Sequence, residues 1–271
     1  MVASLKELKS AGSKGRDSHF TLWNKYVCSH FSVYITKIIL YTPITANHVT
    51  MMMVTLGIIG PVFLFYGSFV AGLVMLHLAV LLDNVDGEVA RAKNQKSMMG
   101  KYLDSFHHVT ASPLMLFGYA FGVYMIHPDI KLIIFGFLAA SFSKSIVLPV
   151  IFDTIVTMRV RGVHPPIHSK TDGSEVKEIE GLADSYKSPL LKVYSIAKEF
   201  WEYPFNLVAL TILFILENSG RTFISNQPYV LTVWFFVIYG TFMALNQLAS
   251  FALHTKRNSI ESFYVFLFGR K

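Results

Sequence analysis

Hydrophobic and polar positions follow one another along this chain in long blocks. Six stretches are predominantly apolar, and each is long enough for a helix of several turns. They cover about residues 49–66, 69–91, 100–126, 130–158, 204–217 and 229–253. Residues 42–271 are therefore predicted to form one all-α domain, an integral membrane bundle of six transmembrane helices.

The second apolar stretch ends earlier than a membrane-spanning helix should. Its apolar part, residues 69–82, extends a helix by about 21 Å at about 1.5 Å per residue, whereas the hydrocarbon core is roughly 30 Å thick. We therefore expect the helix to continue through Asp83 and Asp86. This places two carboxylates slightly inside the membrane surface.

The residues before the first span, 1–41, are predicted to stay outside the bundle. Residues 1–17 combine lysine and arginine with glycine and serine and are expected to form a basic tail. Residues 18–41 mix aromatic, aliphatic and basic side chains, a composition typical of an amphipathic helix in the membrane interface. The alternative is an ordinary helix that packs on the bundle as a cap.

Composition and charge agree with a membrane protein. Hydrophobic residues make up 53% of the chain and charged residues only 15%, which argues against a soluble protein. The net charge of +7 does not require nucleic acid as a partner, because basic loops on one side of a membrane explain it. The tails, the segment between spans four and five, and the joint between spans two and three together with Arg91 and Lys101 at its edges carry 21 of the 24 Lys and Arg residues. Both termini and the acidic residues are thus expected at the cytoplasmic face.

Four ionisable residues are expected to meet where the second and third spans join. On a helix, Asp83 and Asp86 share a face, and so do Asp104 and His108. The polar joint at residues 92–99 would let the two helices fold back as a hairpin. Three carboxylates around one point repel one another unless a cation lies between them, and oxygen ligands favour Mg²⁺ or Mn²⁺.

The same residues lie in a longer spaced motif. The chain reads Asp83-x2-Asp86-Gly87-x2-Ala90-Arg91-x8-Gly100-x3-Asp104-x3-His108. This closely resembles the signature of the CDP-alcohol phosphatidyltransferases, D-x2-D-G-x2-A-R-x8-G-x3-D-x3-D. The last position departs from that signature, because His108 stands where the family has a fourth aspartate.

The resemblance implies a metal-dependent enzyme of phospholipid biosynthesis. Such an enzyme transfers a phospho-alcohol group from a CDP-alcohol, such as CDP-diacylglycerol, to a polar hydroxyl acceptor and releases CMP. It also implies an N-terminal amphipathic helix and a possible homodimer. The metal ligands would be Asp83, Asp86, Asp104 and His108. The nucleotide would be bound by Asp83, Asp86, Gly87, Ala90, Arg91 and Gly100, with weaker candidates Asn47 and Thr50.

The sequence leaves two interpretations of His108 open: a functional residue, as base or metal ligand, or a sign of lost activity. In the family the fourth aspartate is thought to act as the base that deprotonates the attacking hydroxyl. Histidine suits that role, because its ordinary pKa of about 6.5 lies near neutral pH. It can also bind a metal, and more readily Mn²⁺ or Co²⁺ than Mg²⁺. The opposite interpretation is an inactive member that lost its fourth aspartate.

The start of the first span carries the two weaker nucleotide candidates. Residues 46–50 resemble the family's P-N-x-[IVL]-T sequence, with Ala46 in place of the proline. Asn47 is equally well explained as an N-cap of the span.

The acceptor site is the least defined part of the sequence. Lys144 lies near the middle of the fourth stretch, where a charge is costly unless it has a partner. With Arg159 and Arg161 it can bind an acceptor phosphate, or it can pair with Asp104 or Asp153 inside the bundle. Two further alternatives remain, namely a small CDP-polyol donor with a lipid or glycan acceptor, and a non-catalytic protein that binds nucleotide or lipid.

Overall fold

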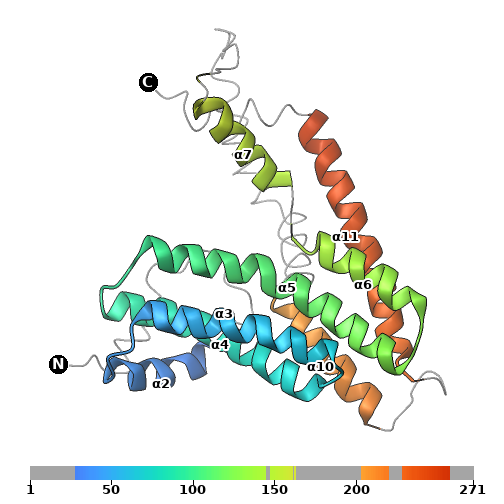
Figure 1. Cartoon of the computed structure of the whole chain (residues 1–271), viewed down its shortest axis with the longest axis horizontal. Helices are drawn as coiled ribbons and strands as arrows, with labels where there is room; N and C mark the ends of the chain where they lie inside the picture. Colours follow the sequence, from blue (N-terminus) through green and yellow to red (C-terminus); the bar gives the residue numbers. More distant parts are fainter. Residues whose placement is uncertain (1–27, 145–146, 161, 163–202, 220–227, 257–271) are drawn as a thin grey trace, which may run out of the picture.

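The computed structural model describes residues 28–144, 147–160, 162, 203–219 and 228–256, and within these ranges all regular structure is helical. Figure 1 shows how the helices are arranged. Their bounds are α2 Ser29–Leu40, α3 Ala46–Phe65, α4 Phe69–Ala92, α5 Met98–Ile126, α6 Ile130–Phe142, α7 Val147–Val160, α10 Phe205–Asn218 and α11 Val230–Lys256.

Helix α3 packs against both α4 and α5. Its contact with α5 is so close that the two backbones touch. A Cβ atom on Gly122 of α5 would overlap the carbonyl oxygen of Leu64, and one on Gly118 would lie 2.7 Å from the carbonyl oxygen of Pro61. Small residues spaced four apart permit this approach in membrane helix pairs. The close packing fixes the position of α5 along the axis of α3.

A tight turn joins α4 to α5 and reverses the chain, as the polar joint predicted (Figure 1). Asn94 has φ 53° and follows the last turn of α4, whose carbonyls accept from the next backbone amides: Asn94 N–H donates to Arg91 and Gln95 N–H to Ala90. This is the Schellman arrangement, in which asparagine tolerates the left-handed conformation. Ser97 then caps α5 by accepting a hydrogen bond from the Gly100 N–H at 2.9 Å.

The first turn of α3 is capped by Thr45 and not by Asn47, for which the sequence had left an N-cap role open. The Thr45 hydroxyl accepts from the His48 N–H at 3.3 Å, and the Thr45 N–H donates to Nδ1 of His48 at 3.2 Å. This is a capping box with histidine at the third helical position. Asn47 is already inside the helix, which leaves its side chain available for another contact.

The predicted single helix over residues 130–158 is two helices, α6 and α7. The chain leaves α6 at Ser143, whose hydroxyl donates to the carbonyl of Ala140, and α7 begins at Val147. Gln247 of α11 donates to the carbonyl of Lys144 at 2.7 Å and to that of Phe142 at 3.5 Å. Pro149 lies in the first turn of α7, where a missing N–H costs little. It marks a helix start that the apolar pattern conceals.

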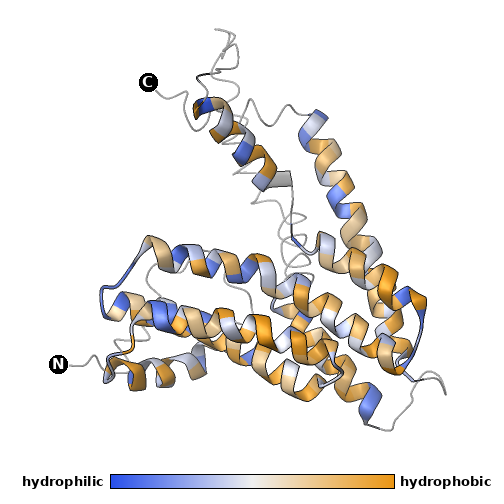
Figure 2. Cartoon of the chain, in the orientation of Figure 1, coloured by the Kyte–Doolittle hydropathy of each residue, from blue (hydrophilic) through white to orange (hydrophobic). Residues whose placement is uncertain are grey.

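Four described helices, α3, α4, α5 and α11, are long and apolar enough to cross a membrane. Figure 2 shows hydrophobic residues along most of their length and hydrophilic residues at the joint between α4 and α5. Large apolar side chains such as Phe63, Trp234 and Phe251 are exposed on them, as expected of surfaces that face lipid. Helices α6 and α10 are shorter apolar helices. The chain thus has the helices of a membrane protein, while six spans and their orientation stay predictions.

Helix α2 occupies part of the predicted interfacial segment, and its faces are unusual. Its buried residues are Ser32, Val33 and Thr36, which face α4. Its exposed side carries Phe31, Tyr34 and Ile38. The basic tail at residues 1–17 and the first part of the predicted interfacial helix, residues 18–27, lie outside the described residues.

Candidate metal centre and its surroundings

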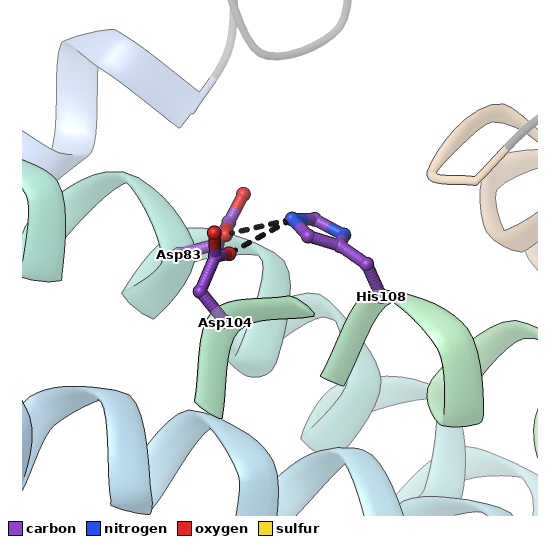
Figure 3. A group of neighbouring side chains, drawn as sticks. All are labelled: Asp83, Asp104 and His108. Carbon is purple, nitrogen blue, oxygen red and sulfur yellow. Dashed lines mark ion pairs between the residues drawn. The ribbon is translucent and has the colours of Figure 1, made fainter. Parts of the chain in front are cut away.

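The turn between α4 and α5 brings Asp83, Asp104 and His108 together, and one ligand atom from each lies within 4.8 Å of the others. Nε2 of His108 is 3.1 Å from Oδ1 of Asp104 and 3.4 Å from Oδ1 of Asp83. Figure 3 shows both carboxylates on the same side of the imidazole ring. The Asp104 and His108 side chains meet because residues four apart share one helix face. We call these three residues the Asp–His cluster.

Asp104 has a further cation beside it. Nζ of Lys101 is 2.8 Å from Oδ2 of Asp104, so each carboxylate oxygen of Asp104 has a different partner. The Lys101 side chain is 78% exposed, and solvent therefore screens this pair strongly. Sequence analysis missed Lys101, although its spacing of three from Asp104 was visible.

Asp86 is not part of the Asp–His cluster. Its Oδ2 accepts a hydrogen bond of 2.8 Å from the Thr50 hydroxyl of α3. The sequence predicted Asp86 as a metal ligand and Thr50 as a nucleotide contact; in the structure these two residues contact each other. The pair is partly buried, and it ties the first turns of α3 to the acidic end of α4.

The Arg91 side chain folds back along its own helix over Gly87. A Cβ atom at Gly87 would lie 3.3 Å from one terminal nitrogen of the Arg91 guanidinium. Glycine at this position thus makes room for arginine four residues later. Ala90, between them, packs with Ala46, Val49, Val85 and Val89 where α3 and α4 meet.

The side chain of Asn47 occupies the space beside Gly100. The Ser97 hydroxyl donates to Oδ1 of Asn47 at 2.9 Å. The same Asn47 oxygen would lie 2.9 Å from a Cβ atom on Gly100. A side chain at Gly100 would therefore displace Asn47 or Ser97, and the start of α5 with them.

Sequence analysis also missed Glu88 and Lys93, which attach α2 to α4. The buried Glu88 carboxylate accepts from the Ser32 hydroxyl at 2.8 Å and from the Thr36 hydroxyl at 2.7 Å. Nζ of Lys93 donates to the carbonyls of Ile39, Thr42 and Ile44 at 2.7–3.2 Å. The only sequence signal was the position of Glu88 inside the motif, between two functional candidates.

Two buried polar groups beside the Asp–His cluster have no hydrogen-bond partner among the residues that the structure describes. They are Nε2 of His107 and the hydroxyl of Tyr203, whose rings are 6.1 Å apart. His107 packs against Gly57 of α3 and is 1% exposed, in agreement with a structural residue. Burial raises the pKa of the Tyr203 phenol, and the nearby Asp83 carboxylate adds to the effect. The phenol therefore stays neutral and can only share its proton in a hydrogen bond.

The acceptor candidates lie at the break between α6 and α7 and beyond it. Lys144 is half-buried at the break, within electrostatic range of His107 beside the cluster. Arg159 is exposed in the last turn of α7, which leads away from α5 (Figure 1). Arg161 lies outside the described residues. Asp104, one predicted ion-pair partner of Lys144, pairs with Lys101 and His108.

The Asp–His cluster has the chemistry of a divalent metal site. Two carboxylates and an imidazole are common ligands of first-row transition ions, and carboxylates also bind Mg²⁺. The three side chains are half-buried and come from two helices that a short turn fixes relative to each other. The donor set therefore fits a metal ion without any large rearrangement.

Comparison with known proteins agrees with this geometry. The family model described as CDP-alcohol phosphatidyltransferase matches residues 43–164. This range contains α3, α4, α5, α6 and α7, and with them the whole Asp–His cluster. A search among curated proteins gave no match. Residues 43–164 of the chain are therefore similar to the CDP-alcohol phosphatidyltransferase family.

Proposed function

We propose that this protein transfers a phosphatidyl-type group from a CDP-lipid, such as CDP-diacylglycerol, to a polar hydroxyl acceptor and releases CMP. The observation that carries the proposal is the Asp–His cluster inside the segment that matches the family. The apolar helices support a lipid donor, because the donor's acyl chains would remain in the bilayer beside them. The reaction belongs to phospholipid biosynthesis.

The pyrophosphate of the donor requires positive charge. The Asp–His cluster would hold a divalent ion, Mg²⁺ or Mn²⁺, which neutralises phosphate charge and aligns the reacting groups. Arg91 supplies a second cation on the same helix and can pair with a phosphate. The guanidinium lies over the small Gly87, where a Cβ atom would be 3.3 Å from one of its terminal nitrogens.

The nucleotide half is expected beside the first turns of α3 and α5. Asp86 and Thr50 are joined by a hydrogen bond, and Asn47 contacts Ser97 next to Gly100. These groups bring hydrogen-bond donors and acceptors to the acidic end of α4. They support a site for the ribose or the base, with Ala90 as a packing residue.

The transfer itself replaces a phosphoanhydride bond of the pyrophosphate by a phosphate ester bond. The acceptor hydroxyl oxygen bonds to the phosphorus that carries the lipid, and the bond from that phosphorus to the oxygen it shares with CMP breaks. The shared oxygen leaves with CMP, and the acceptor hydroxyl loses its proton. Nε2 of His108 can take this proton or bind the metal, but its lone pair cannot do both at once.

The acceptor is expected on the side of Lys144. The half-buried ammonium lies near the cluster, and Gln247 holds the backbone of the helix break in place. A cation at this position suits an acceptor that carries a phosphate. Arg159 and Arg161 are weaker candidates for the same role.

CMP release by purified protein tests the proposal. The assay contains CDP-diacylglycerol in liposomes, Mg²⁺ or Mn²⁺, and glycerol 3-phosphate, serine, inositol or inositol 1-phosphate as acceptor. We expect CMP with one of these acceptors, and a loss of at least about a hundredfold in Asp104→Asn, because removal of a catalytic charge costs several kcal/mol.

Asp129→Asn is the matched control, because Asp129 caps α6 through its Oδ1 and asparagine keeps that cap. Its activity should equal that of the wild type. Absence of CMP with every acceptor would contradict the lipid-donor proposal and would direct the same assay to small CDP-polyols. Absence of CMP with those as well would favour a non-catalytic protein.

A further inference from the structure

We infer that the Asp–His cluster binds one divalent ion through Nε2 of His108, and that this nitrogen ligand makes the site select Mn²⁺ or Co²⁺ over Mg²⁺. The inference rests on the metal-dependent transfer proposed above and deepens it. It concerns the position where this chain departs from the family's signature. It follows from the position of Nε2 of His108 beside two carboxylates and from the hydrogen bond that Asp86 accepts from Thr50.

The separations within the cluster are those of ligands around one ion. Two ligands about 2.1 Å from a metal and at right angles to each other lie about 3.0 Å apart, and the separation is larger at a tetrahedral angle. The distances from Nε2 of His108 to the two carboxylate oxygens are 3.1 and 3.4 Å. The three side chains therefore already point at a common centre (Figure 3).

The charge available for a second ion is small. An all-aspartate motif would supply four carboxylates, but here the imidazole of His108 replaces one of them. Of the remaining three carboxylates, that of Asp86 lies outside the cluster and accepts a hydrogen bond from Thr50. The carboxylate of Asp104 also pairs with Lys101. One ion with two carboxylates and an imidazole thus satisfies the cluster.

The imidazole decides which ion is favoured. Mg²⁺ is a hard cation that prefers oxygen and gives up its water reluctantly, so a nitrogen ligand adds little to its affinity. First-row transition ions bind imidazole well, and their affinity rises from Mn²⁺ to Co²⁺. A site with one nitrogen in place of oxygen should therefore shift toward these ions.

Pulsed electron paramagnetic resonance of the protein loaded with Mn²⁺ tests the ligand directly. We expect ¹⁴N coupling from the imidazole in the wild type and its loss in His108→Asp, which restores the family's aspartate. Calorimetry on the same samples should show Mn²⁺ bound at least about tenfold more tightly than Mg²⁺ in the wild type. That ratio should fall severalfold in His108→Asp.

His127→Asn is the control for adventitious histidine binding. His127 caps the other end of α5, about 28 Å along the helix from His108. This variant should keep both the ¹⁴N coupling and the metal preference.

Two results would overturn the inference: a Mn²⁺ signal without ¹⁴N coupling, or the same ratio of affinities in wild type and His108→Asp. Either would leave His108 free to act as the general base. Because neither measurement uses donor or acceptor, a protein that fails to release CMP can still confirm the metal site. A protein that releases CMP can likewise refute it.

Discussion

At the scale of single residues, several motif positions are explained by the neighbour that fills the adjacent space. Gly87 accommodates Arg91, and Gly100 accommodates Asn47. The Thr50 hydroxyl donates a hydrogen bond to Asp86, and Lys101 forms an ion pair with one oxygen of Asp104. The spacing of the motif thus records contacts between α3, α4 and α5 as well as chemistry.

Gly100→Ala tests this view. The added Cβ atom would lie 2.9 Å from Oδ1 of Asn47 and 3.1 Å from Oγ of Ser97, so the hydrogen bond between these two residues must yield. We expect a loss of roughly 1–3 kcal/mol in stability, the usual cost of overpacking, measured as a lower melting temperature in detergent. Ser105→Ala, an exposed change on the same helix, should leave it unaltered. An unchanged melting temperature in Gly100→Ala would show that Asn47 moves aside at no cost.

At the scale of elements, α2 is held to α4 by polar groups on its inner side, while its outer side is apolar. Ser32 and Thr36 donate to the buried Glu88, and Lys93 binds the carbonyls at and after the end of α2. Because Glu88 lies between Gly87 and Ala90, α2 is attached to the same helical turn that carries the motif. The interfacial helix predicted for residues 18–41 therefore remains a prediction with a physical basis, since the exposed residues of α2 suit a lipid surface.

Replacing Glu88 alone should lower the stability of the protein more than replacing Glu88, Ser32 and Thr36 together. Glu88→Leu leaves two buried hydroxyls without an acceptor, which costs roughly 1–3 kcal/mol for each group. The triple change Ser32→Ala, Thr36→Val and Glu88→Leu makes the contact apolar throughout and should recover most of the loss. Melting temperatures in detergent, with proteolysis at Lys37 as a probe of α2, measure both effects. A triple variant as unstable as Glu88→Leu would contradict the assignment.

At the scale of the whole molecule, the helices and the basic residues together predict an orientation. The joint between α4 and α5 carries Lys93 and Lys96, and the distribution of Lys and Arg predicts that this side lies in the cytoplasm. The connection between α5 and α6, residues 127–129, would then lie on the opposite side. The Asp–His cluster near the first joint would open toward soluble acceptors and departing CMP.

Site-directed labelling tests the orientation. The single Cys28 is buried, so Cys28→Ser provides a background without cysteine. In that background a membrane-impermeant maleimide should label Lys96→Cys only after cells are opened and should label Pro128→Cys in intact cells. Both positions are exposed in the structure. The reverse pattern would place the cluster on the outer side, and labelling of both positions in intact cells would contradict a membrane crossing by α5.

The break between α6 and α7 shows where sequence reasoning reaches its limit. The apolar pattern of residues 130–158 is continuous enough for one helix, and Pro149 was the only local sign of a second start. The break is stable because Gln247, about a hundred residues later, satisfies the carbonyls of Lys144 and Phe142. No periodicity within 130–158 contains that information.

The sequence by itself determined the all-helical class, the reversal between α4 and α5 and the meeting of Asp83, Asp104 and His108. Each of these follows from local rules: apolar runs, turn residues, and spacings of three and four along a helix. Only the tertiary structure decided that Thr50 donates to Asp86, that Glu88 binds α2, and that α6 ends at Phe142. Buried polar groups must find partners, and which partner is within reach depends on how distant helices pack rather than on the residues beside them in the chain.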